Sequence, residues 1–150
     1  MKAHFLDGQD TLLTASDLAA QGVYFQQLPL DPERYQGPLD EVKADNGYIE
    51  QDIVALDPHT PNLEAICAKF IDEHTHDDDE VRFVLEGAGI FDIRSTDDRW
   101  MRVQVDAGDL IVVPKGRNHR FLLTEARSIR CVRLFKDAAG WVPIYRHAGA

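Results

Sequence analysis

Short strand-like segments separated by turn residues fill residues 71–136, and this pattern constrains the fold more than any other feature of the sequence. The segments are 7 or 8 residues long, rich in Val, Ile, Phe and Leu, and punctuated by Gly, Pro, Asp and Asn. Closely spaced short strands of this kind indicate a sandwich or barrel of the jelly-roll type. The expected strands are residues 80–87, 88–95, 101–108, 109–116, 119–125 and 129–135.

Residues 1–70 have a more mixed texture, in which short helices are expected. Thr14 and Asp17 have the spacing of a capping box and Gly22 fits a helix end, so residues 14–22 are predicted to form a helix. The other predicted elements are a helix at 33–46, where Gly37 and Pro38 obscure the start, a strand at 48–56, and a helix at 59–70 with Thr60 as N-cap and Pro61 at its first position.

The length of 150 residues and the 44% hydrophobic content suit one domain with a substantial core. We expect N-terminal helices and strands in residues 1–70, the barrel strands and the functional site in 71–136, and a tail in 137–150. The 16 Lys and Arg residues against 26 Asp and Glu give a formal net charge of −10. This charge argues against a surface that binds nucleic acid or an anionic membrane.

The N-terminal segment MKAHFLDGQD lacks the long apolar core of a signal peptide, and no apolar run approaches the roughly 18 residues of a membrane span. Cys67 and Cys131 stand alone in apolar surroundings, and no CxxC pair exists. We therefore expect reduced cysteines, no membrane partner and a cytoplasmic location.

Histidines and carboxylates gather in the stretch EHTHDDDEVRFVLEGAG, residues 73–89. His74 and His76 are two residues apart, which on a strand places both imidazoles on one face. Glu80 follows an acidic turn at the head of the next strand. An HxH pair alone is usually a surface feature, and we expect the aspartates at 77–79 to be a solvated turn rather than ligands.

A third histidine, His119, follows in VPKGRNHRF, where Pro114 and Gly116 predict a turn that returns the chain toward the first motif. Three imidazoles and one carboxylate suit a divalent first-row metal such as Fe, Ni, Co or Mn. They would leave two octahedral positions open for a bidentate substrate. The lack of thiolate ligands argues against a closed structural zinc site.

The two halves, HxHxxxE with Gly87 and GDLIVVPKGRNH, together resemble the double motif of the cupin superfamily, which implies a jelly-roll barrel. Within that superfamily the sequence resembles the acireductone dioxygenase family. The likeness is carried by residues 69–94, 108–121 and 133–141, and it extends back through 47–56 to the helix at 14–22, whereas residues 23–46 look shortened.

The resemblance implies that His74, His76, Glu80 and His119 bind one Fe(II) or Ni(II) ion per chain. It gives Arg82 a catalytic role, holding negative charge on a bound enediolate, although a salt bridge to the aspartates at 77–79 is the plainer alternative. Glu73 is expected to support a ligand histidine, with a solvated edge as the alternative. Phe70, Phe121, Arg133 and Trp141 are implied to bind substrate; the three aromatic side chains could equally be barrel core.

The family cleaves acireductone, a 1,2-dihydroxy-3-keto compound of methionine salvage, with O2. The iron form gives 2-keto-4-methylthiobutyrate and formate, and the nickel form gives methylthiopropionate, formate and carbon monoxide. Arg120 replaces the usual bacterial tryptophan and Leu122 the following aspartate, which puts substrate placement in question. The resemblance favours a monomer.

Two alternatives stay open at this point. One is another metal-dependent cupin, either an isomerase or a different dioxygenase, and the other is a non-catalytic cupin that binds a small molecule. The remaining histidines have no assigned role: His4, His59 and His147.

Overall fold

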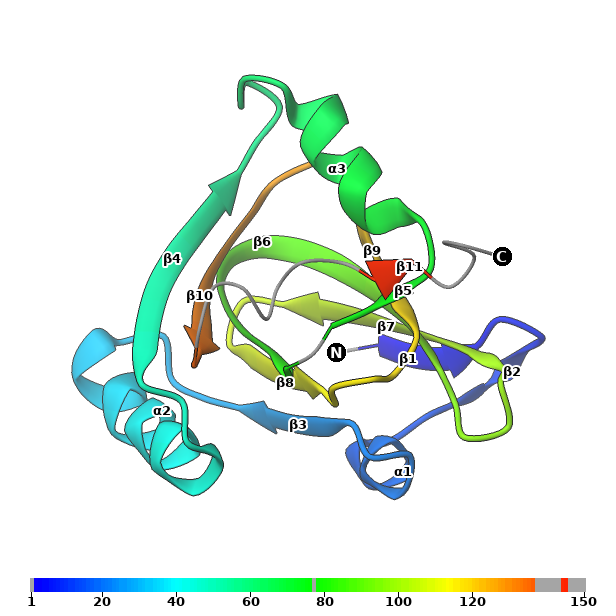
Figure 1. The fold of residues 1–150 in the computed structure, drawn as a ribbon, viewed down its shortest axis with the longest axis horizontal. Coiled ribbons are helices and arrows are strands. Elements are labelled where there is room, and N and C mark those ends of the chain that lie inside the picture. Colours follow the sequence, from blue (N-terminus) through cyan, green and yellow to red (C-terminus); the bar gives the residue numbers. More distant parts are fainter. Residues whose placement is uncertain (1, 77, 137–143, 146–150) are drawn as a thin grey trace.

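The structure, a computed structural model, describes residues 2–76, 78–136 and 144–145. Its strands pair antiparallel and curl into a half-barrel, with helices on the outside (Figure 1). This architecture confirms the expected mainly β fold with a few short helices. The strands are β1 (Lys2–Phe5), β2 (Gly8–Leu12), β3 (Tyr24–Gln27), β4 (Glu50–Leu56), β5 (His74–Thr75), β6 (Glu80–Arg94), β7 (Trp100–Asp106), β8 (Asp109–Val113), β9 (His119–Leu123), β10 (Ile129–Phe135) and β11 (Ile144–Tyr145).

Strand β6 belongs to both halves of the curled sheet. One half has the order β11-β5-β9-β6-β7-β1-β2, and the other runs β4-β10-β6-β8-β3. The first residues of β6 pair with β8 and β10, and residues 88–94 pair with β7 and β9. Glu80, the last residue of the HxHxxxE motif, is therefore the first residue of the strand that joins the two halves.

The two strands expected at 80–87 and 88–95 are one continuous strand, so this prediction was wrong. Gly87 has φ 75°, and the ladder with β10 shifts register between Arg130 and Cys131. The extra residue of this bulge is Leu85, and Gly87 two residues later has the positive φ, so the strand bends here and does not reverse. A Cβ at this position would lie 2.1 Å from the carbonyl oxygen of Ser128, so no larger residue fits.

The first two predicted helices are confirmed. Helix α1 (Ala15–Ala20) begins with the expected capping box between Thr14 and Asp17. Helix α2 (Pro32–Asn46) begins earlier than the predicted region, after the N-cap Asp31, and it continues through Pro38. Three strands in the N-terminal region, β1, β2 and β3, were not predicted; they extend the sheet beyond β7 and β8.

Helix α3 (Leu63–Ile71) begins later than the sequence suggested, so the assignment of Thr60 as its N-cap was wrong. The hydroxyl of Thr60 instead accepts a hydrogen bond from the backbone N–H of Asp57 at 2.9 Å, within a preceding turn. Asn62 is the residue at the cap, in a left-handed conformation with φ 59°. The helix lies beside β9 and leads directly into β5 (Figure 1).

Two apolar clusters fill the interior. The larger one includes Phe91, Ile93 and Met101 and lies between the two halves of the sheet, and the smaller one includes Leu39 and Phe83 and packs α2 against its neighbouring strands. Burial of these side chains stabilises the curled sheet that holds the site. Among the described helices, none combines the length and the apolar composition needed to cross a bilayer.

Candidate metal centre

Three predicted ligands meet inside the half-barrel. His74 on β5 and His119 on β9 are direct register partners, and His76 follows β5 in the same extended segment. One ring nitrogen from each lies within 4.8 Å of the other two, and all three side chains are buried. The structure therefore gathers these histidines, 45 residues apart in sequence at the extremes, around one point.

Glu80, the first residue of β6, completes the cluster. Its Oε2 lies 2.8 Å from Nε2 of His119, yet neither atom has a hydrogen-bond partner with suitable geometry among the described residues. Nδ1 of His76 is likewise buried without a partner. Buried polar atoms are normally satisfied, so this group of orphaned nitrogen and oxygen atoms fits a bound cation.

Two of the imidazoles are oriented by main-chain carbonyls. Nδ1 of His74 lies 2.7 Å from the carbonyl oxygen of Asp72, and Nδ1 of His119 lies 2.9 Å from that of Arg117. A carbonyl oxygen can only accept, so in both rings Nδ1 donates. Nε2 of each ring is then left with the lone pair that a metal requires.

The electrostatics of the cluster favour neutral imidazoles at His74 and His76 and an ionised carboxylate at Glu80. Burial lowers the pKa of His74, and it lowers that of His76 to about 4. Burial acts to raise the pKa of Glu80, but Arg82 and His119 outweigh it and hold that pKa below its usual range. Burial also opposes a charge on His119, whose pKa is nevertheless raised by Glu80. Imidazole nitrogens and a carboxylate oxygen suit a divalent first-row metal, whose positive charge would balance the charge of Glu80.

The acidic turn before Glu80 is less exposed than expected. Asp79 accepts hydrogen bonds from the hydroxyl of Tyr48 at 2.6 Å and from the backbone N–H of Lys115 at 2.8 Å. Asp78 accepts one from the N–H of Asp79. Both carboxylates are half-buried, so the prediction of a solvated turn was wrong for them, because the fold packs two distant segments against it. Asp77 lies outside the described residues.

Arg82 lies beside the centre. It is two residues after Glu80 on β6, so both side chains point to the same face of the sheet. Its guanidinium donates to Oε1 of Glu80 at 2.8 Å and to the carbonyl of Val81 at 3.1 Å. The carboxylate of Glu80 thus presents one oxygen to the arginine and the other to the histidines. Arg82 is mostly buried, which keeps its charge close to any group bound at the cluster.

A pocket of about 280 Å³ opens beside these residues. Phe70, Phe121 and Arg133, three of the four predicted substrate-binding residues, line it; Trp141 lies outside the described residues. Positive charge exceeds negative charge on its wall, although the chain has a net charge of −10. The full lining is Val54, Leu56, Ile66, Lys69, Phe70, Glu80, Arg82, Phe91, Phe121, Ile129, Cys131 and Arg133.

Sequence reasoning missed two charged residues of this pocket region. Lys69 lines the pocket from α3, and only its place one residue before the predicted Phe70 could have suggested it. Asp52 on β4 binds the guanidinium of Arg133 through two hydrogen bonds, at 2.9 and 2.6 Å. That pairing needed the register of β10 against β4, which the sequence does not reveal.

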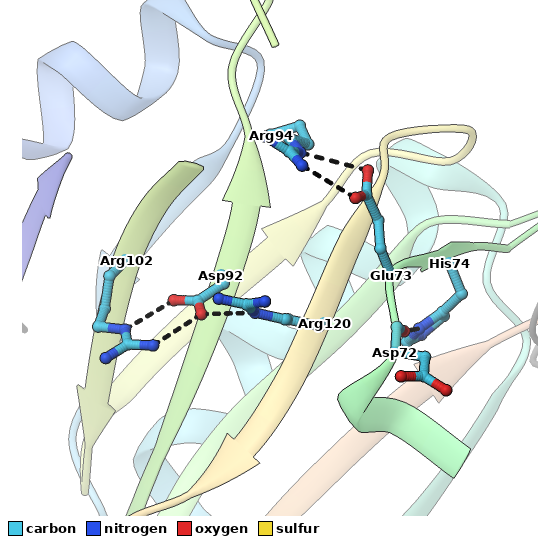
Figure 2. Close-up of polar contacts among 7 residues, drawn as sticks. All are labelled: Asp72, Glu73, His74, Asp92, Arg94, Arg102 and Arg120. Atoms are coloured by element: carbon cyan, nitrogen blue, oxygen red, sulfur yellow. Dashed lines mark hydrogen bonds and ion pairs between the residues drawn. The ribbon is translucent and has the colours of Figure 1, made fainter. Parts of the chain in front are cut away.

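Residues that flank the ligands form ion pairs on the other face of the sheet (Figure 2). Glu73, expected to support a ligand histidine, accepts two hydrogen bonds from Arg94, at 3.2 and 3.1 Å. Arg120 donates to Asp92 at 2.8 Å and stacks on Trp100. The arginine that replaces a family tryptophan therefore borders a second hollow, lined also by Glu73 and Arg94, and not the pocket of about 280 Å³.

Comparisons with known proteins agree with this geometry. A sequence profile described as the ARD/ARD' family matches residues 6–143. Acireductone dioxygenases of Heterostelium pallidum and Dictyostelium discoideum are 43% and 41% identical over 147 residues, 98% of this chain and 99% and 100% of theirs. An acireductone dioxygenase from Bacillus anthracis, with a cadmium ion in its active centre, superposes with a TM-score of 0.88 at 29% identity, covering 96% of this chain and 97% of that one.

Proposed function

Because the chain belongs to the ARD/ARD' family, we propose that its buried His–Glu centre binds one Fe(II) or Ni(II) ion and acts on acireductone. Its activity is that of an acireductone dioxygenase, which cleaves acireductone with O2 in methionine salvage. The cupin-type fold expected from the sequence agrees with the Bacillus anthracis structure over nearly the whole chain. We further propose a single-domain monomer in the cytoplasm, a setting that suits its two free cysteines.

One observation carries the assignment of the centre: three buried histidines and the buried carboxylate of Glu80 converge. Nδ1 of His76, Nε2 of His119 and Oε2 of Glu80 have no hydrogen-bond partner in the part of the chain that the structure describes. His74, His76, His119 and Glu80 would hold the metal through three neutral nitrogens and one oxygen. When bound, the metal supplies Lewis acidity and a template for a chelating enediolate.

The chain's own residues would prepare the pocket for an anion. Arg82 and Arg133 contribute two guanidinium groups on neighbouring strands, and Lys69 adds a third cation. Charge-assisted hydrogen bonds from Arg82 would hold the negative oxygens of the substrate next to the ligand cluster. These cations provide the local attraction that an anion needs near a protein with a strongly negative net charge.

The apolar part of the pocket would receive the methylthioalkyl tail. Phe70 and Phe121 offer aromatic surface, and thioether groups pack favourably against aromatic rings. The apolar lining would also limit the access of water to the reacting carbons. The metal form would decide the products, which are 2-keto-4-methylthiobutyrate and formate with iron, or methylthiopropionate, formate and carbon monoxide with nickel.

The test is an anaerobic reconstitution. Metal-free protein is loaded with Fe(II) or Ni(II), mixed with acireductone and O2, and followed by loss of substrate absorbance and by product analysis. We expect acceleration with either metal and loss of it in His74→Ala. His59→Ala, an exposed histidine outside the site, is the matched control. Substrate loss no faster with loaded than with metal-free protein would refute the proposal.

A further inference from the structure

We propose that Arg94 is a positioning residue: its side chain holds His74 in its metal-binding orientation through Glu73, and its main chain supports the segment that orients His119. The proposal rests on the metal centre proposed above. Arg94 is the last residue of β6 and touches neither imidazole in the contacts described here. It acts on each histidine through residues next to or bearing the carbonyl group that accepts the hydrogen bond from Nδ1.

The side chain of Arg94 acts toward His74. Its Nε and Nη2 donate to the two carboxylate oxygens of Glu73 (Figure 2). The carbonyl of Asp72, which accepts from Nδ1 of His74, belongs to the same planar peptide unit as the backbone nitrogen of Glu73. Holding Glu73 therefore restricts the rotation of the peptide unit that sets the ring of His74.

The main chain of Arg94 acts toward His119. Its N–H donates to the carbonyl of Asn118 at 2.9 Å, and its own carbonyl accepts from the guanidinium of Arg117 at 3.1 Å. The carbonyl of Arg117 in turn accepts from Nδ1 of His119. Arg94 thus binds on both sides of the peptide unit that orients the second ligand.

Arg94 is itself held in a fixed position. Its guanidinium lies 3.9 Å from the centre of the Trp100 ring and donates to the carbonyl of Asp98. The side chain of Glu73 is only 11% exposed, so the pair is well shielded from water. A bidentate, partly buried arginine–carboxylate pair of this kind fixes geometry better than an exposed one.

Loss of this support should weaken metal binding, because partners that orient ligand histidines typically contribute about 10- to 100-fold to metal affinity. The variants are Arg94→Gln and Glu73→Gln. The matched control is Arg99→Gln, since Arg99 also makes a bidentate pair, with Asp7, and also stacks on an aromatic ring, that of Phe5.

The readouts are the Ni²⁺ dissociation constant, from competition with a chelator, and the free energy of unfolding of each metal-free protein in urea. A third readout is the visible spectrum of the Co²⁺-loaded protein, which reports ligand geometry. We expect about 10- to 100-fold weaker Ni²⁺ binding and an altered Co²⁺ spectrum in Arg94→Gln and Glu73→Gln. Arg99→Gln should bind Ni²⁺ like the unchanged protein.

Unchanged Ni²⁺ affinity and Co²⁺ spectra in both variants would overturn the proposal, even if the metal-free proteins were less stable. If Arg94→Gln does not fold, Glu73→Gln decides alone, because it keeps the contacts of Arg94 with Asp98 and Trp100. Failure of the unchanged protein to bind Ni²⁺ would instead refute the metal centre itself, and this proposal with it.

Discussion

Arg82 on β6 and Arg133 on β10 are direct cross-strand partners, and both side chains line the pocket beside the histidine cluster. Like charges directly opposite one another destabilise a sheet. Each arginine here has its own carboxylate, Glu80 for Arg82 and Asp52 for Arg133. The sheet thus tolerates two adjacent cations at the position where an anionic substrate would bind.

The first prediction concerns Arg82→Gln. We expect kcat/KM for acireductone to fall about 10- to 150-fold, because hydrogen bonds to charged groups contribute about 1.5–3 kcal/mol. Steady-state kinetics at full metal occupancy measure this, with metal content checked separately because Arg82 also binds Glu80. Arg130→Gln, an exposed position on the same sheet, is the control. An unchanged kcat/KM would contradict a substrate role for Arg82.

A second prediction uses the close approach of Gly89 to Phe121. A Cβ at Gly89 would lie 2.7 Å from Cε2 of Phe121, so Gly89→Ala should displace this ring within the pocket. We expect the KM for acireductone to rise about tenfold, because the displaced ring would lose contact with the substrate worth about 1.4 kcal/mol of binding energy. Adding Phe121→Leu to the variant should restore much of the loss. If KM stays unchanged in Gly89→Ala, the ring of Phe121 does not contact the substrate.

The third prediction tests the bend in β6. Gly87→Ala should lower the free energy of unfolding by about 2–4 kcal/mol, because two costs combine. Alanine would be forced into a left-handed conformation, and its Cβ would clash with the backbone of Ser128. Gly47→Ala is the control, since Gly47 has the same φ of 75° but only an ordinary contact, 3.6 Å from Lys136. That variant should lose only about 1–2 kcal/mol, the cost of the left-handed conformation alone. If urea unfolding shows that Gly87→Ala and Gly47→Ala lose the same free energy of unfolding, the clash with Ser128 contributes nothing measurable.

A fourth prediction concerns acid stability. Arg133 holds the pKa of Asp52 below its usual range, so the folded protein keeps this carboxylate charged where the unfolded chain binds a proton. The pair therefore stabilises the fold fully above about pH 4 and loses its contribution as the pH falls through the lowered pKa. Because Asp52 is 41% exposed, the effect should stay below about 1 kcal/mol.

Urea unfolding of Asp52→Asn between pH 7 and pH 2 measures this effect. We expect the variant to be less stable than the unchanged protein near neutrality, with the difference shrinking in acid. Arg133→Gln should give the same acid profile, because it removes the same pair. A difference that stays constant down to the lowest pH would contradict the assignment.

The fifth prediction concerns metal removal. Ni²⁺ at about 100 times its dissociation constant should stabilise the fold by about 2.7 kcal/mol, which corresponds to a rise of about 5–10 °C in Tm. Excess chelator should reverse this rise. His119→Ala should show no rise, whereas His59→Ala should behave like the unchanged protein. A shift that persists in His119→Ala would place the metal elsewhere.

Most of the core strands and the histidines that gather at the centre were predictable because their determinants are local. Residues 129–135 were assigned with the bounds that β10 has, and the spacing of His74, His76 and Glu80 marked one side of the centre. The segment GQDTL of β2 lacks alternation, and its pairing with β1 is visible only in the folded sheet. Local hydrophobic periodicity reports a strand only where one face is buried.

The misjudged parts depend on contacts between distant residues. Thr60 satisfies the capping pattern of a helix, but an adjacent turn uses its hydroxyl. Asp79 looks like a solvated residue until the fold places Tyr48 against it. The contact of Glu73 with Arg94 joins positions 21 residues apart, so no local sequence pattern could predict it. Composition and spacing identify candidate ligands, whereas their supporting contacts follow from strand register.

The anchoring of Asp79 has a consequence for how the metal is captured. Because Asp79 accepts hydrogen bonds from Tyr48 and Lys115, the residue directly before Glu80 is held in place before any ion arrives. The entropy lost in ordering Glu80 is then lost during folding, and the ion meets a carboxylate that is already in position. Metal uptake should therefore involve dehydration and deprotonation, and not the coupled folding that structural zinc domains require.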